Sequence, residues 1–312
     1  MPETTFIDWL LQASTPSIRY QTLTRLLDLP ETDPSVHLVW QTMQAEGPIP
    51  AILEKQSETG AWTGERSFYT PKYTSTHWSM LLLVELGADP ADPRLQRGAR
   101  SVLDAQKQTV SRWLNEDMHG LSCFWGNLLR YAVYSGLQDD PRLDEVLASL
   151  TREVQTGWCC RYNGETPCAW GAGRALWGFA GLPDAMKTPA VQAAIQSACH
   201  LLLDEHNLMK ADYPTWSKGK KSPLWSRLNF PLFYQADRLS VLRALAELHL
   251  LGLPGAQSAL DWLASSRTAE GRWSGSSPFR QRTWASLGDD QETSRWVSLQ
   301  ATLVLKATKT VY

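Results

Sequence analysis

The chain has 312 residues, of which 43% are hydrophobic and 20% are charged, and its formal net charge is −2. This balance excludes an intrinsically disordered chain, and without a basic excess we expect no nucleic-acid partner. The length suffices for a sizeable core, so we expect residues 1–312 to form a single domain. The 15 Trp outnumber the 9 Tyr and the 7 Phe, which favours a repeated structural device or an aromatic cavity.

Sequence features of export and membrane insertion are missing. The N-terminus, Met1 to Phe6, has neither the basic segment nor the apolar run of a signal peptide. The most apolar stretch, residues 80–88, is short and contains Glu85, so we expect no transmembrane segment. The five cysteines are odd in number and lie in the middle of the chain, unlike those of a secreted disulfide scaffold. We therefore expect a cytoplasmic protein with reduced thiols.

One short pattern recurs along the chain. It consists of a small or polar residue, one spacer and an aromatic residue, followed by apolar residues at helical spacing. Each copy predicts the start of a buried helix, for example over residues 77–86. The clearest copies are Thr76-His77-Trp78, Cys123-Phe124-Trp125, Cys168-Ala169-Trp170 and Ser294-Arg295-Trp296, and weaker copies end at Tyr20 and Tyr234.

A second, more amphipathic helix follows most of these predicted helices. It often starts at an Asp-Pro pair, as at Asp92-Pro93 and Asp140-Pro141, because Asp caps a helix and Pro fits its first turn. Strand signals are nearly absent. Together with a first helix over residues 5–13, the chain contains six helical hairpins, which predicts an all-α protein.

Six helical hairpins form either an open solenoid or a closed ring. A solenoid requires polar caps at both ends. The helix predicted over residues 5–13 lacks a partner unless the ring closes. We therefore expect an (α/α)6 barrel, or α-α toroid, in which the aromatic anchor residues surround one mouth of a central cavity.

Turn motifs before the anchor helices carry a family resemblance. The segment from Gln56 to Trp62 fits the QxxxGxW core of the QW motif, and Gly157-Trp158 is a truncated copy. A further copy from Trp262 to Trp273 has Arg in place of Gln. The chain thus resembles the prenyltransferase/squalene-oxidase repeat superfamily, which includes squalene cyclases, terpenoid cyclases and protein prenyltransferases, and is most similar to its short bacterial single-domain members. We interpret Trp62 and Trp273 as residues that fasten turns.

The resemblance implies an enzyme that acts on an isoprenoid-like apolar small molecule by cyclase or transferase chemistry. The chain departs from both patterns. Near the sixth anchor it has Gly288-Asp289-Asp290-Gln291 in place of the DxDD acid motif of squalene cyclases. Of the zinc ligands of protein prenyltransferases it retains only Cys168, because Gln235 follows Tyr234 where those proteins have His.

The cysteines suggest a metal site at the barrel mouth. Cys123 and Cys168 occupy equivalent repeat positions, and Cys159 lies in the loop before the second of these helices. Three thiolates and one further ligand suit tetrahedral zinc. His119, His77, Cys160 or water would be the fourth ligand. The alternative is that these cysteines are small buried apolar residues.

Three further side chains are candidate catalytic groups. Asp237, three residues after Tyr234, would act as a general acid if its pKa is raised by burial, or would pair with Arg243. Asp290 would assist a cation, bind a metal or cap a helix. His77, next to an anchor, would serve as base, ligand or cap.

The anchors themselves are candidate substrate-binding residues, because aromatic ring faces stabilise carbocations and ammonium groups. Two arginines also follow anchors and would point into the barrel, where a buried guanidinium requires an internal carboxylate or an anionic ligand. The basic loop over residues 207–227 is either a docking segment for diphosphate or a solvated loop. The candidates are Trp78, Trp125, Trp170, Tyr234, Arg130 and Arg174.

Two functions remain open from the sequence. The first is an enzyme of the isoprenoid-converting type, assisted by zinc at the cysteines. The second is a non-catalytic toroid that binds a ligand or a protein and contains a structural zinc or no metal. An open metal position that faces a deep cavity would favour the enzyme.

Overall fold

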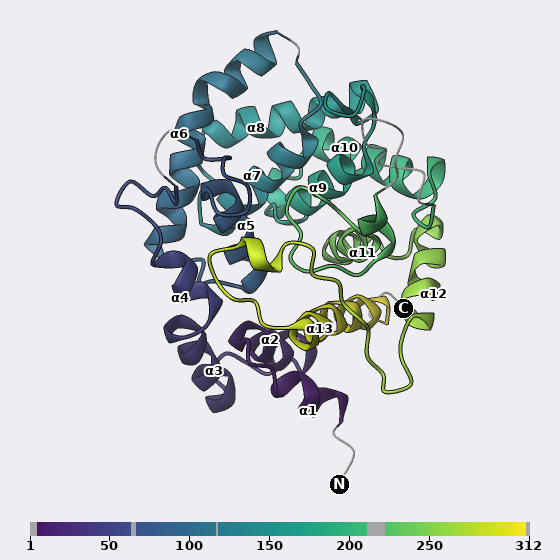
Figure 1. Cartoon of the computed structure of the whole chain (residues 1–312). Coiled ribbons are helices and arrows are strands. Elements are labelled where there is room, and N and C mark those ends of the chain that lie inside the picture. The colour runs from purple at the N-terminus through teal and green to yellow at the C-terminus, as the bar shows by residue number, and fades with distance from the viewer. Residues whose placement is uncertain (1–4, 64–66, 117, 211–221, 310–312) are drawn as a thin grey trace.

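The computed structural model describes residues 5–63, 67–116, 118–210 and 222–309. Over these residues the protein is mostly helical (Figure 1), which confirms the predicted all-α class. The strands β1 (Cys159–Cys160) and β2 (Thr166–Pro167) form a small antiparallel hairpin. The α-helices are α1 (Phe6–Leu11), α2 (Pro16–Gln21), α3 (Pro34–Ala45), α4 (Pro48–Leu53), α5 (Thr76–Leu86), α6 (Pro93–Asn115), α7 (Ser122–Tyr134), α8 (Arg142–Thr151), α9 (Ala169–Ala180), α10 (Pro189–Cys199), α11 (Arg238–Glu247), α12 (Gln257–Ser265) and α13 (Asp290–Thr308).

The helices are of two kinds. Those that begin at the predicted anchors, such as α5 and α9, are buried on nearly all sides. Those between them, such as α6, have a polar exposed face. The side chain of Asp92 accepts a hydrogen bond from the backbone N–H of Arg94 and caps α6, with Pro93 in the first turn. The Asp-Pro pair thus starts a helix there, as predicted. Among the described residues, no helix is long and apolar enough to cross a membrane.

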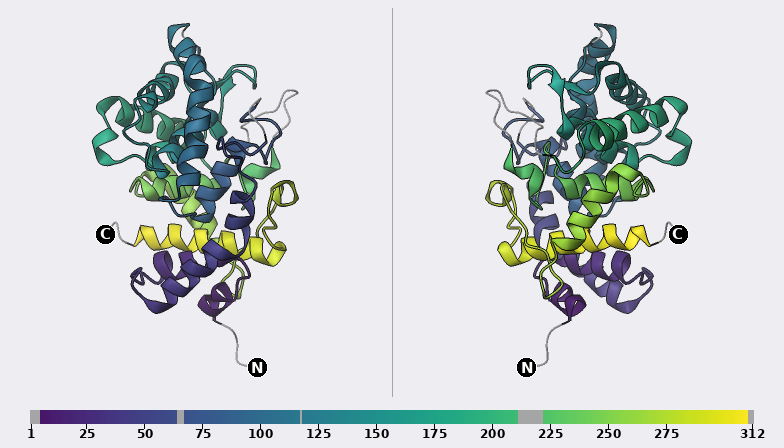
Figure 2. Two further views of the ribbon diagram at one scale, coloured as in Figure 1. Left: turned by 90° about the vertical axis from the view of Figure 1, so that its left-hand side faces the viewer. Right: turned by 90° about the vertical axis from the view of Figure 1, so that its right-hand side faces the viewer.

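Consecutive buried helices pack against one another. Helix α5 contacts α7, α7 contacts α9, α9 contacts α11 and α11 contacts α13. Helix α13 also contacts α1, α2 and the π-helical segment Thr22–Leu26. The C-terminal helix therefore lies beside the N-terminal helices (Figure 1), and Figure 2 shows the same arrangement from two other sides.

A buried carboxylate joins these two ends of the chain. Glu292, in the first turn of α13, accepts hydrogen bonds from the backbone N–H groups of Ser14 (3.1 Å) and Thr15 (2.9 Å). Its partner Arg295, 2.5 Å away, donates to the carbonyl of Trp9 over 2.9 Å. Side chains from the far end of the sequence therefore provide hydrogen-bond partners for backbone groups at the junction of α1 and α2.

Two tryptophans of the QW-like turns fasten helix ends. The indole Nε1–H of Trp62 donates to the carbonyl of Ile52 in the last turn of α4, over 2.7 Å. The Nε1–H of Trp273 donates to the carbonyl of Leu263 in the last turn of α12, also over 2.7 Å. Both indoles are buried and donate to carbonyls in the last turn of a helix, where backbone donors are few. This geometry agrees with their interpretation as turn-fastening residues.

Two other tryptophans make comparable contacts. The indole of Trp225 donates to the carbonyl of Leu208 over 3.0 Å, a contact that the sequence analysis missed. In the truncated motif, Trp158 donates to the hydroxyl of Ser197 over 3.1 Å instead of to a carbonyl. These four indoles thus connect separate elements of the chain.

We expect Glu292→Gln to lower the free energy of unfolding by about 2 kcal/mol, because a charged acceptor of several buried hydrogen bonds is replaced by a neutral one. Burial raises the pKa of Glu292, but the hydrogen bonds from Thr15, Arg295 and Ser14 outweigh this effect and lower it below 4.5. The folded state thus gains stability from this carboxylate above pH 4.5 and loses it as the pH falls.

Urea unfolding at several pH values measures this difference. The gap between the wild-type protein and the variant should shrink below pH 4.5, where the unfolded wild-type chain becomes protonated. A gap that stays constant from pH 7 to about pH 3 would contradict the assignment.

Candidate functional site

Two cavities lie at opposite ends of the buried helices. The first, which we call the aromatic pocket, has a volume of about 630 Å³ and lies at the N-terminal ends of α7 and α9. The second, the charged pocket, has a volume of about 810 Å³ and lies toward the C-terminal ends of α5, α7, α9 and α11. The aromatic pocket is lined by Phe68, Tyr69, Lys72, Gln106, Leu121, Cys123, Phe124, Cys160, Tyr162, Asn163, Cys168, Trp170 and Tyr234.

The walls of the aromatic pocket are mainly ring systems. The rings of Trp170 and Tyr234 meet edge to face, with centroids 5.9 Å apart. The ammonium group of Lys72 lies 4.5 Å from the centroid of the Tyr234 ring. On another wall, Phe68 and Phe124 are 5.7 Å apart. Such walls suit an apolar ligand, and Lys72 adds one positive charge at its edge.

Three thiols line this pocket, but they differ from the three that the sequence suggested. Cys123 and Cys168 are both present, and the third is Cys160, not Cys159. Consecutive residues of a strand point to opposite faces, so β1 directs only one of its two cysteines toward the pocket. Cys159 instead lies near Glu153. Burial is the larger cause that raises the pKa of the Cys159 thiol, and the charge of Glu153 raises it further.

The environment of each pocket thiol sets its ionisation. Burial raises the pKa of Cys123 to about 12. The hydrogen bond from the Cys168 thiol lowers the pKa of Cys160 to about 6, against the opposing effect of burial. The same hydrogen bond and burial raise the pKa of Cys168. Cys160 is therefore the thiol of this pocket that ionises first, which makes it the best nucleophile.

The donor set of the suggested zinc site does not come together. His119 is exposed and lies near Glu153 on the same side as Cys159, outside the pocket wall. In the described part of the chain, no group of three or more His, Cys, Asp or Glu side chains is arranged to hold a metal ion. The geometry therefore gives no support to the predicted zinc.

His77 is fully buried behind the aromatic pocket. Its Nδ1 lies 3.2 Å from the Tyr131 hydroxyl, and its ring stacks on Tyr69 at 5.6 Å between centroids. Burial, helped by the positive charge of Arg174, lowers the pKa of His77 to about 3. The imidazole is therefore neutral at physiological pH and is separated from the pocket by Tyr69 and Phe124, which line it.

The two candidate acids lie outside both large cavities. Asp237 caps α11 and accepts hydrogen bonds from the backbone N–H groups of Ser240 (2.7 Å) and Asn229 (2.9 Å). Burial raises its pKa, as predicted, against the effect of these hydrogen bonds. It does not pair with Arg243, which binds Glu85.

Asp290 is a surface residue. Its side chain is 89% exposed and forms an ion pair with Arg280 over 2.8 Å. The neighbouring Asp289, and not Asp290, caps α13 by accepting a hydrogen bond from the N–H of Glu292 over 2.9 Å. Asp290 therefore has no ligand-facing position in this structure.

Of the aromatic anchors, only Trp170 and Tyr234 reach the aromatic pocket. Trp78 is fully buried, and its indole donates to the carbonyl of Tyr69 over 2.7 Å. Trp125 is fully buried as well and belongs to the core. Two of the residues that stand two positions before an anchor, Cys123 and Cys168, also line the aromatic pocket.

The two candidate arginines lie at different depths. Arg174 is buried between the two cavities, where its Nε donates to the carbonyl of Gln235 over 2.7 Å and burial lowers its pKa to about 10. Arg130 lines the charged pocket and pairs with Glu247 over 2.6 Å. The predicted internal carboxylate is therefore present for Arg130. Lys218, Lys220 and Lys221 of the basic loop lie outside the described residues.

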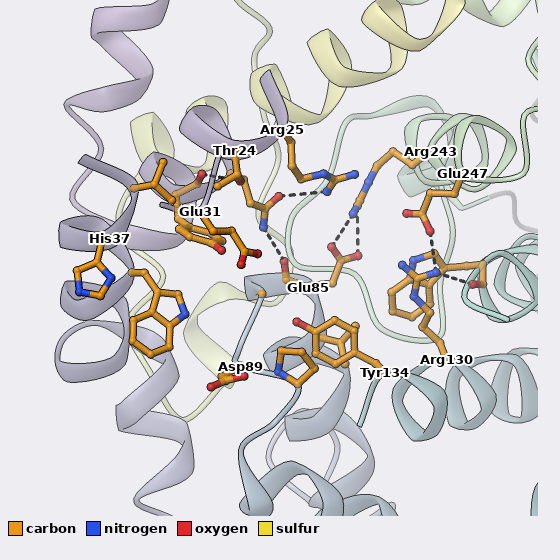
Figure 3. A pocket seen from close by; sticks show the side chains of 18 residues that line it. Thr24, Arg25, Glu31, His37, Glu85, Asp89, Arg130, Tyr134, Arg243 and Glu247 are labelled. Atoms are coloured by element: carbon orange, nitrogen blue, oxygen red, sulfur yellow. Dashed lines mark hydrogen bonds and ion pairs between the residues drawn. The ribbon is translucent and has the colours of Figure 1, made fainter. Parts of the chain in front are cut away.

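The charged pocket was missed by the sequence analysis. Its floor holds the ion pair of Glu85 and Arg243, with oxygen and nitrogen atoms 2.8 Å apart (Figure 3). Burial raises the pKa of Glu85, but the charge of Arg243 outweighs this effect and lowers it. The signal in the sequence was Glu85 itself, the one charged residue in an otherwise apolar stretch.

Comparison with known proteins found neither a protein-family model nor a curated protein that matches this chain.

We expect His77 to stay neutral from pH 8 to about pH 4, because its folded-state pKa is about 3. A histidine with a lowered pKa gives stability above its ordinary value of 6.5, and this stability is lost as the pH falls toward the folded-state value. NMR titration of the ring signals, assigned with His77→Gln, measures this. His200, whose pKa is raised by its hydrogen bond to Asp204, is the internal comparison. A His77 midpoint above pH 6 would refute the assignment.

We also expect Cys160 to be the first thiol alkylated by iodoacetamide at pH 7, because its pKa is about 6. Cys123 and Cys199, whose pKa values burial raises to about 12, should react at least about tenfold more slowly. Mass spectrometry of timed digests measures the order. Cys160→Ser should remove the fast phase, and fast labelling of Cys199 in the folded protein would contradict the prediction.

Proposed function

We propose that the chain is a closed α-α toroid of the prenyltransferase/squalene-oxidase repeat type that binds an apolar, isoprenoid-like small molecule in the aromatic pocket. The order of helix contacts supports the ring, since each buried helix packs on the next and α13 returns to α2. The equivalent indole hydrogen bonds of Trp62 and Trp273 support the repeat.

We infer the class of ligand from the position of the aromatic pocket. It lies at the N-terminal ends of α7 and α9, where the repeat places its anchors, and its walls combine aromatic rings with Leu121. Its volume of about 630 Å³ is in the range of small-molecule sites. An apolar chain would bury its surface against these walls, and an isoprenoid would also place its double bonds against ring faces.

An enzyme of the cyclase or transferase type is the first form of this proposal. Cys160 is the pocket group with the most nucleophilic character, and Lys72 provides a positive charge at the pocket edge for an anionic leaving group. Two of the suggested zinc ligands, Cys159 and His119, lie outside the pocket wall.

A non-catalytic ligand-binding toroid is the second form, and one observation favours it. The predicted acids, Asp237 and Asp290, are engaged in a helix cap and a surface ion pair, and among the residues that the structure describes no carboxylate lines the aromatic pocket. Incubation with farnesyl diphosphate separates the two forms, because an enzyme changes the recovered compound and a binding protein returns it intact.

We expect prenyl alcohols to bind with affinity that rises from geraniol to farnesol, because each buried methylene group contributes about 0.8 kcal/mol. Displacement of an apolar fluorescent probe, or isothermal titration calorimetry, measures the affinities. Trp170→Ala should weaken farnesol binding about tenfold, since it removes one ring wall.

Trp40→Ala is the matched control, because Trp40 lines the charged pocket instead. It should leave farnesol binding unchanged. Equal losses in both variants, or equal affinity for all prenyl alcohols, would show that binding does not occur in the aromatic pocket.

A further inference from the structure

We propose that the charged pocket is a second binding site, independent of the proposed function, and that its ligand is a small zwitterion that carries an ammonium group and a carboxylate. Figure 3 shows the side chains that line this pocket. The two kinds of charge that such a ligand requires lie in different parts of the pocket wall.

The carboxylate of the ligand would bind at Arg25. This guanidinium lines the pocket and makes one hydrogen bond, from Nη1 to the Gln21 side chain, at a long distance of 3.4 Å. Among the described residues, no carboxylate forms an ion pair with Arg25. Since a guanidinium carries five N–H donors, most of its capacity is open to a bidentate acceptor.

The neighbouring arginines cannot take this role as readily, because each already has a carboxylate partner. Arg243 binds Glu85 over 2.8 Å, and Arg130 binds Glu247 over 2.6 Å. These two pairs cancel their own charges within the pocket. They leave Arg25 with unmatched charge, and Figure 3 shows its guanidinium group close to that of Arg243.

The ammonium group of the ligand would bind at the other part of the wall, beside Glu31 and Asp89. Both carboxylates line the pocket, and in the described part of the chain neither forms an ion pair. Both carboxylates also lie near Tyr20. Burial is the main cause that raises the pKa of the Tyr20 hydroxyl, and the charges of Glu31 and Asp89 raise it further. Carboxylates next to an aromatic ring form a favourable site for an ammonium ion.

Aromatic side chains would hold the body of the ligand. Tyr134 lines the pocket with its hydroxyl fixed to the carbonyl of Ala88 over 2.6 Å, so its ring faces the space between the charged parts. Trp177 and Trp40 also contribute to the wall. An amino acid with an aromatic or apolar side chain fits this combination of groups.

Opposite charges explain why a zwitterion is preferred over an ion of one sign. A simple anion would satisfy Arg25 but would be repelled by Glu31 and Asp89. A simple cation would satisfy the carboxylates and leave Arg25 without an acceptor. Only a ligand with both charges satisfies all three groups.

Three matched probes test the proposal: phenylalanine with both charges, phenethylamine with the ammonium group only, and 3-phenylpropionate with the carboxylate only. Calorimetry or ligand-observed NMR with the full chain measures their affinities. We expect phenylalanine to bind at least about tenfold more tightly than either of the others. Equal affinities, or no binding of phenylalanine at millimolar concentration, would overturn the proposal.

Variants assign each charge. Arg25→Gln should reduce the affinity for phenylalanine to that for phenethylamine. Arg25→Lys should retain part of the preference for phenylalanine over phenethylamine. Glu31→Gln combined with Asp89→Asn should reduce the affinity for phenylalanine to that for 3-phenylpropionate. Arg112→Gln is the control, because Arg112 pairs with Glu116 on the surface away from the pocket. Unchanged phenylalanine binding by a folded Arg25→Gln protein, shown by circular dichroism, would also overturn the proposal.

Discussion

The hydrogen-bonding needs of carbonyls at buried helix ends are a constraint on which much of this structure depends. A helix leaves its last carbonyls without partners, and a buried end requires donors from elsewhere. The indoles of Trp62 and Trp273 supply them at the ends of α4 and α12, while their rings fill the adjacent core. One residue type thus provides both the hydrogen bond and the packing that hold one helical hairpin to the next.

The direction of the helices divides the interior into two chemical environments. At the N-terminal ends of α7 and α9 the cavity is apolar and contains thiols, whereas toward the C-terminal ends it contains paired and unpaired charges. Cations near helix C-termini are favoured by the helix dipole, which suits Arg25 in the last turn of its segment. The two ends therefore differ in their chemistry.

Local patterns were sufficient for the helices but not for the site. The apolar spacing after Trp78 and the Asp92-Pro93 pair predicted where α5 and α6 begin, because helix burial and capping depend on neighbouring residues. The structure does not support the choice of Cys159 over Cys160 as a thiol of the site. The direction of these two side chains depends on the pleat of β1, which pairs with β2. The role of Asp237 was likewise decided by Asn229, which only the folded loop brings to it.

The sequence by itself determined the helical class, the start of α5, α7 and α9, and the turn-fastening role of Trp62 and Trp273, whereas α11 begins at Arg238 and not at the anchor Tyr234. These follow from periodicity and from hydrogen-bonding needs within short segments. The tertiary structure alone decided which thiols face a cavity, where Glu85 meets Arg243 across 158 residues, and that a charged pocket exists at all. The physical reason is that the direction of a side chain and the identity of a distant charge partner depend on packing between elements, which no local pattern encodes.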